Sequence, residues 1–199
     1  RENLKELMKF RFLTRLFGEG ESAVKLIGAV YSRLSKAHLI RNNPQFWLQY
    51  AMSRIEVGDL DSAETYLNTA LGLAEKRGAE YSPFQILDQR ARLFFVKNTR
   101  PGKTFKKSEI TTAIKDLRNL LEISSGEITY LYRSVPLIGD FGELHIDTLH
   151  EDMRADLKNL LGDIDERGKA FTRLPRSQKG ETNVLRKAMA DVLTVLQFG

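Results

Sequence analysis

Apolar side chains recur along this chain at intervals of three and four residues, the spacing that gathers them on one face of an α-helix. Such stripes run through residues 4–17, 23–37, 63–74, 87–94, 110–120, 149–164 and 185–196. No stretch alternates apolar and polar residues in the way that a half-buried strand does. The sequence therefore predicts an all-α fold of about eight helices.

Turn-forming residues separate these stripes. They are Asn42-Asn43-Pro44, Gly58-Asp59, Gly78, Ser82-Pro83 and Arg100-Pro101-Gly102. Pro44 and Pro83 are predicted to start helices, because an amide hydrogen in the first turn has no partner within the helix. Pro136 falls inside an apolar segment, so we expect that segment to be kinked or short. The polar, basic stretch 169–180 is expected to form a loop.

The composition limits the classes of site that the chain can hold. It has 199 residues, enough to bury a core without a disulfide or a metal. It has no cysteine, which excludes disulfides, thiolate metal sites and a cysteine nucleophile. No apolar run approaches the roughly 20 residues that span a bilayer. We expect a soluble, cytoplasmic protein and, since it begins at Arg1, a fragment of a larger one.

Residues 44–77 have the order of small and large side chains found in a known helical repeat. Trp47 stands early in the first predicted helix, Ala51 follows it, Gly58-Asp59 forms the turn, and Ala63, Leu67 and Ala70 stand in the second helix. The segment resembles the tetratricopeptide repeat (TPR), a helical hairpin of about 34 residues. It departs from that family at Arg54, where a tyrosine is usual. It also lacks the closing proline, so the second helix is predicted to run on to Arg77.

The small residues explain why such a segment forms a hairpin. Ala51, Ala63 and Ala70 let two helices approach closely, and Trp47 and Leu67 fill the space beside them. About three stacked units are needed for a stable array of this kind. We therefore expect residues 1–199 to form one domain of antiparallel hairpins stacked as a short TPR-like solenoid, with a helical extension over 143–199.

A longer run, from Asn43 to Phe95, is similar to a region of large bacterial antiphage proteins. The residues that carry this resemblance are NPQFWLQYAMSRIEVGDLDSAETYLNTALGLAEKRG and, further on, FQILDQRARLFFV. In those proteins such helical regions lie near the C-terminal end, after a STAND-type nucleoside triphosphatase or a sirtuin-like NADase domain. The resemblance implies that this chain is a sensor or scaffold segment and that any enzyme lies outside it.

Three motifs resemble parts of catalytic or ligand-binding sites but lack the sequence context that such sites require. Gly102-Lys103-Thr104 follows a helical stripe instead of a strand and lacks the first glycine of a phosphate-binding loop. Asp140-Phe141-Gly142 stands without the other motifs of a protein kinase. His145 and His150 are spaced too widely for two zinc ligands on one helix face. We expect no catalytic residue, no cofactor, no metal and no small-molecule substrate.

Positive charge is the strongest functional signal, since the formal net charge is +5. Lys97, Arg100, Lys103, Lys106 and Lys107 fall in one predicted connection, and Arg173, Arg176 and Lys179 in another. Basic clusters attract phosphate and acidic surfaces, although only Phe105 is present here for base stacking. A solvated loop without a partner is the first interpretation of either cluster. Binding of nucleic acid or of an acidic protein surface is the other.

These observations favour a non-catalytic module for protein–protein interaction, oligomerisation or sensing. The alternative is a basic helical module that binds nucleic acid, and a self-contained enzyme comes third. We expect a protein partner or self-association, and we expect no binding to a membrane.

Overall fold

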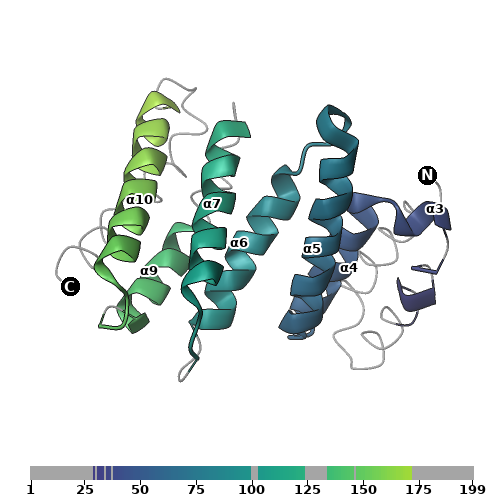
Figure 1. Ribbon diagram of the computed structural model, residues 1–199, viewed down its shortest axis with the longest axis horizontal. Coiled ribbons are helices and arrows are strands. Elements are labelled where there is room, and N and C mark those ends of the chain that lie inside the picture. The colour runs from purple at the N-terminus through teal and green to yellow at the C-terminus, as the bar shows by residue number, and fades with distance from the viewer. Residues whose placement is uncertain are drawn as a thin grey trace. The chain divides into compact units, whose positions relative to one another are not determined.

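The computed structural model describes residues 29, 31–33, 35–36, 38–99, 103–123, 134–145 and 147–171 of the chain. Within them every regular element is a helix, which confirms the predicted all-α fold (Figure 1). The seven α-helices of these ranges are α3 (His38–Arg41), α4 (Pro44–Glu56), α5 (Leu60–Arg77), α6 (Phe84–Asn98), α7 (Lys107–Ile123), α9 (Val135–His145) and α10 (Glu151–Phe171). A short 3-10 helix, η1 (Gly78–Glu80), follows α5. None of the helices in the described ranges is long and apolar enough to cross a membrane.

Most helix ends lie where the sequence predicts them. Pro44 is the first residue of α4, and the side chain of Asn43 caps that helix by accepting a hydrogen bond from the Gln45 amide at 3.0 Å. The second helix of the repeat runs to Arg77, as the missing proline predicts. The stripes over 87–94 and 110–120 lie in α6 and α7, and the stripe over 149–164 lies mostly in α10.

The sequence predicted a loop over 169–180, and this prediction was wrong for its first residues. α10 continues to Phe171, because its last residues include good helix formers and the nearest helix breaker is Pro175. Pro136 is the second residue of α9, a helix of 11 residues, and the part of the expected kinked or short segment before residue 134 lies outside the described residues. The predicted helices over 4–17 and 185–196, and most of the stripe over 23–37, lie outside the described residues.

The chain divides into two compact units, residues 1–86 and 87–199, with the boundary inside α6. In the first unit α4 and α5 pack against each other as a helical hairpin (Figure 1). Its core contains Phe46, Leu48 and Ala51 from α4 and Ala63, Leu67 and Ala70 from α5, all fully buried. A single domain over 1–199 stays a prediction.

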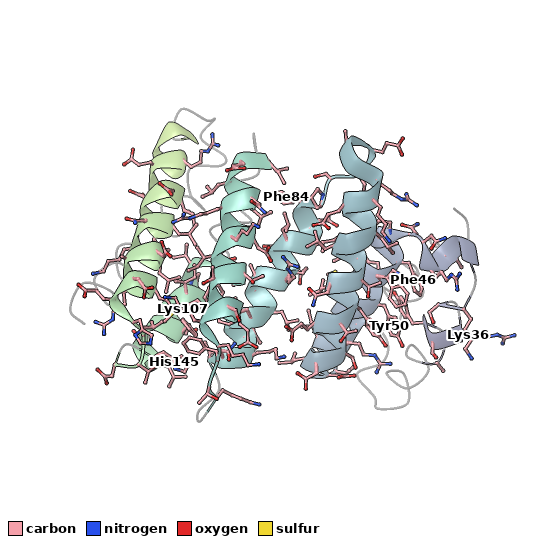
Figure 2. All side chains as sticks on the ribbon, viewed as in Figure 1. Lys36, Phe46, Tyr50, Phe84, Lys107 and His145 are labelled. Atoms are coloured by element: carbon pink, nitrogen blue, oxygen red, sulfur yellow. The ribbon has the colours of Figure 1, made fainter. Side chains whose placement is uncertain are left out.

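In the second unit α6 and α7 run antiparallel, because Phe84 lies at the upper end of α6 and Lys107 towards the lower end of α7 (Figure 2). Arg90 of α6 bonds to Asp116 of α7. The predicted stripes of α7 and α10 are buried: Ile110, Ala113, Leu117 and Leu120 in α7, and Met153, Leu157, Leu160 and Ile164 in α10. The periodicity therefore identified the faces that form this core.

Helix α9 runs parallel to α6. Phe141 of α9 packs on Phe95 of α6 with ring centroids 5.5 Å apart, and further along both helices His145 bonds to the Asn98 carbonyl at 2.7 Å. The residues in the second contact are 47 positions apart in the sequence.

Helix α10 runs parallel to α7, and the two lie side by side (Figure 1). Lys107 pairs with Asp152 near the two helix starts, and Arg167 bonds to the Leu121 carbonyl near the end of α7. The partners in these contacts are 45 and 46 residues apart. The α9–α10 segment thus meets the α6–α7 hairpin at almost the same sequence offset in both helix pairs.

Candidate functional site

The repeat positions of the first unit lie on the packed faces of the α4–α5 hairpin. Ala51, Ala63, Leu67 and Ala70 have no exposed surface. Trp47 is partly buried, and its indole Nε1 donates to the Arg41 carbonyl at 2.7 Å. The residues quoted for the repeat therefore include four buried packing positions and one partly exposed ring.

The turn between α4 and α5 depends on Gly58, Asp59 and Arg54. Gly58 has a φ of 78°, which side-chain-bearing residues rarely adopt. Asp59 caps α5 by accepting from the Ser62 amide at 3.3 Å, and its carboxylate lies 3.7 Å from the Arg54 guanidinium. Arg54 thus joins the end of α4 to the start of α5. Sequence reasoning noted Arg54 only as a departure from the repeat and missed this role.

Aromatic rings form the second part of this unit's core. Tyr31 stacks on Tyr50 at 4.7 Å and Tyr50 stacks on Tyr66 at 4.2 Å between centroids, and Phe46 lies beside Tyr50 on α4 (Figure 2). Burial raises the pKa of the Tyr66 phenol to about 12, and its hydrogen bond with Tyr50 acts in the same direction. The Arg54 guanidinium bonds to the Tyr50 hydroxyl at 3.2 Å, which raises the pKa of Arg54. Tyr31, Phe46 and Tyr50 are almost fully buried, so these rings form part of the core.

The open end of the hairpin is closed by two long-range bonds. Tyr81 donates from its hydroxyl to Gln45 Oε1 at 2.9 Å, and Arg77 donates to the Asn42 carbonyl at 3.1 Å. Burial raises the pKa of Tyr81. Both bonds connect the end of α5 and its continuation to the start of α4.

The basic residues of the first predicted cluster do not share one environment. Lys97 is in the last turn of α6 and is partly buried, whereas Lys103 and Lys106 are exposed in the segment before α7. Lys107 begins α7 and pairs with Asp152, the second residue of α10 (Figure 2 labels Lys107). Arg100, Arg173, Arg176 and Lys179 lie outside the described residues.

Acidic side chains also reach this segment. The Glu109 carboxylate accepts from the Lys106 amide at 2.7 Å, and the hydrogen bond from Lys107 lowers the pKa of Asp152. Of the described positions in this cluster, Lys103 and Lys106 project as exposed side chains outside the ion pair with Asp152, and the Glu109 carboxylate lies at the Lys106 backbone. Sequence reasoning missed the compensation, because Asp152 is 45 residues from Lys107.

The motifs that were set aside as chemical have structural explanations. The apolar residues before Gly102-Lys103-Thr104 belong to helix α6, so the strand that a phosphate-binding loop requires is not there. Asp140-Phe141-Gly142 lies inside α9, and Phe141 is fully buried. Phe141 is a core residue.

The two histidines of the suggested cluster also differ in environment. His145 is 8% exposed, and its Nε2 bonds to the Asn98 carbonyl, whereas His150 is exposed. The rings of Phe105 and Phe141 lie 5.0 and 4.8 Å from the His145 ring. Across the described part of the chain, no three histidine, aspartate or glutamate side chains are grouped to hold a metal ion.

The second unit contains a buried ion pair that the sequence analysis did not predict. Arg90 makes two hydrogen bonds of 2.5 Å to the Asp116 carboxylate, which is almost fully buried. Burial raises the pKa of Asp116, although the Arg90 guanidinium acts in the opposite direction. The Arg90 guanidinium and the Asp116 carboxylate bind each other, so the pair joins α6 to α7 and provides no free acid or base.

A hollow of about 530 Å³ lies between the later parts of α7 and α10. It is lined by Arg118, Leu121, Glu122, Asp163, Glu166 and Arg167. Arg118 lies 3.7 Å from Asp156, and Arg167 bonds to the Leu121 carbonyl. The hollow is therefore lined by charges of both signs, and its two guanidinium groups already have partners.

Comparison with protein-family models, with curated proteins and with solved structures found no significant match.

Proposed function

We propose that this chain is a helical-repeat scaffold whose hairpins stack as a short TPR-like solenoid. The observation that carries the proposal is the offset that recurs between the helix ends of the second unit. Three contacts at helix ends, between α6 and α9 and between α7 and α10, join residues 47, 45 and 46 positions apart, whereas the ion pair of Arg118 with Asp156 joins residues 38 positions apart. Successive units of a repeat array pack in this way, because each helix lies parallel to its counterpart in the next unit.

The function that such an array serves is recognition of other macromolecules, here protein–protein interaction, oligomerisation or sensing. The buried positions of the α4–α5 hairpin support the resemblance to a tetratricopeptide repeat, and that resemblance supports a non-catalytic role. The likeness to the C-terminal helical regions of bacterial antiphage proteins extends the proposal to a sensor segment of such a protein. A protein partner, or a second copy of the chain, is the ligand that this proposal implies.

Nucleic-acid binding is the second candidate, because Lys103 and Lys106 are exposed next to the start of α7. The ion pair between Lys107 and Asp152 weighs against it, since a lysine paired with a carboxylate must exchange that partner for a phosphate.

Fluorescence anisotropy with a labelled single-stranded RNA and a labelled DNA duplex distinguishes the two candidates. The scaffold proposal expects no submicromolar binding at roughly 150 mM salt. The matched variant replaces Lys103, Lys106 and Lys107 with glutamine. Tight binding that weakens steeply with salt, and is lost in this variant, would favour the nucleic-acid candidate instead.

Sedimentation velocity over a wide range of protein concentration tests the self-association form of the scaffold proposal. Concentration-dependent growth of the sedimenting species at physiological salt supports it. If the chain is a monomer at all concentrations, self-association is ruled out and the scaffold proposal requires a different protein as the partner.

A further inference from the structure

The last carbonyl groups of an α-helix have no partner within the helix and must find one elsewhere. At the end of α6, the Phe94 carbonyl accepts from Asn98 Nδ2 at 2.8 Å and the Phe95 carbonyl accepts from the Thr99 amide at 2.9 Å. The Asn98 carbonyl has a partner outside α6. It accepts from His145 Nε2, on another helix, at 2.7 Å. Because a carbonyl can only accept, Nε2 of this ring carries the hydrogen.

The end of α7 shows the same arrangement. α7 has no basic residue in its last turn, where a positive charge would complement the helix dipole. A guanidinium nitrogen of Arg167, on α10, donates to the Leu121 carbonyl at 2.9 Å. The cation at this helix end is therefore supplied by a residue 46 positions further along the chain.

We propose that these two bonds form a device that transmits a displacement of α9–α10 to the hairpin before it. His145 and Arg167 cap both helices of the α6–α7 hairpin, and they do so at opposite ends, because α6 and α7 are antiparallel. Moving the α9–α10 segment removes both caps and lets the last turns of α6 and α7 fray. The inference rests on the proposed scaffold function, in which a partner that binds one hairpin acts on its neighbour.

Two further polar contacts between α7 and α10 in the described residues join side chains and do not cap a helix. Lys107 pairs with the Asp152 side chain, and Arg118 with the Asp156 side chain. Arg118 is exposed on the same helix pair as Arg167, so it provides a matched control. Removing its charge disturbs the α7–α10 contact without removing a carbonyl partner.

Hydrogen-exchange mass spectrometry on the full chain tests the caps separately. Arg167→Met keeps much of the side chain but removes the donor, and we expect amides in the last turn of α7 to exchange about tenfold faster. His145→Met should have the same effect on the last turn of α6. His145→Gln, which retains an N–H donor, should restore slow exchange there. Arg118→Met should leave both turns unchanged.

Transmission is tested by loosening the docking of α9 at Phe141, which contacts the His145 ring but lies on a different helix from Arg167, so that the end of α7 is the informative readout. Phe141→Leu reduces the ring contacts with α6, and we expect faster exchange in the last turns of α6 and α7 together, although Leu121 lies on a different helix pair. Unchanged exchange at the end of α7 in Arg167→Met, or an equal rise throughout residues 87–171, would overturn the proposal. Because Arg167 is exposed, its variant remains informative if a His145 variant fails to fold. The anisotropy and sedimentation results would still decide the scaffold function by themselves.

Discussion

At the scale of single residues, side-chain volume decides how closely α4 and α5 can pack. Ala51, Ala63 and Ala70 have no exposed surface, and Ala74 is 2% exposed. A methyl group at each position leaves room for the opposing helix, while Leu67 and Phe46 supply the bulk. The sequence predicted the buried repeat positions from their spacing. It could not predict that Tyr31 stacks on Tyr50, because helix periodicity assigns a face and does not name the ring that meets it.

Ala63→Leu should destabilise the chain by about 1–3 kcal/mol, because added methylene groups in a packed contact force neighbouring side chains and backbone apart. Chemical denaturation followed by far-UV circular dichroism measures the change. Ala155→Leu makes the same substitution at an exposed position of α10 and should stay within about 0.5 kcal/mol of the parent. Equal stability of Ala63→Leu and the parent would contradict the assigned contact.

At the scale of the elements, two glycines of the hairpin have opposite roles. Gly58 has positive φ in the turn, whereas Gly72 lies inside α5 with no neighbouring atom within 4 Å of an added Cβ. Gly72→Ala should stabilise the chain by about 1 kcal/mol, because alanine loses less backbone entropy in a helix. Gly58→Ala should destabilise it by about 1–2 kcal/mol, because left-handed backbone is costly for alanine. Thermal melts of both variants should therefore shift in opposite directions, and shifts of the same sign would count against the turn geometry.

The ion pair between α6 and α7 provides an element-scale prediction with a pH dependence. Arg90→Met leaves the Asp116 carboxylate buried without its partner, and we expect a loss of about 3–5 kcal/mol at neutral pH. Burial already raises the pKa of Asp116 in the folded chain, and losing the guanidinium raises it further. A carboxyl whose pKa is higher in the folded state stabilises that state at low pH and loses this contribution as the pH rises through the folded pKa.

Urea denaturation of the parent and Arg90→Met from pH 4 to pH 8 checks the sign of this effect. The stability difference between the two proteins should be smallest at the acidic end and should grow as the pH rises. A double variant, Arg90→Met with Asp116→Leu, removes both charges and should recover much of the loss, because no charge remains buried. A difference that did not depend on pH would show that the loss comes from packing alone.

The elements also show where sequence reasoning stops. The apolar periods placed α5, α6, α7 and most of α10, because a helix needs only local spacing to be recognised. They could not place Asp152 beside Lys107 or His145 beside Asn98, since these pairs are 45 and 47 residues apart and carry no local signature. The basic residues of the first cluster were therefore named without the acidic side chains that lie beside Lys106 and Lys107.

At the scale of the whole chain, the question is whether residues 1–199 behave as the single domain that the sequence predicts or as two units. Each of the units 1–86 and 87–199 has its own buried core. The chain has one tryptophan, Trp47, which lies in the first unit. Its fluorescence reports that unit, whereas far-UV circular dichroism reports helices throughout the chain. Because stability in repeat proteins is a sum of local and neighbouring terms, a long array can lose its cooperativity.

We expect the two signals to separate when one unit is weakened. Arg90→Met should shift part of the circular dichroism transition to lower urea concentration and leave the Trp47 transition near that of the parent, because the substituted pair lies in the second unit. Ala63→Leu should do the reverse and shift the Trp47 transition fully. Both curves are recorded on the same samples, so that unfolding midpoints are compared directly. If both signals moved together by equal amounts in both variants, the chain would be a single cooperative domain and the two cores would unfold as one.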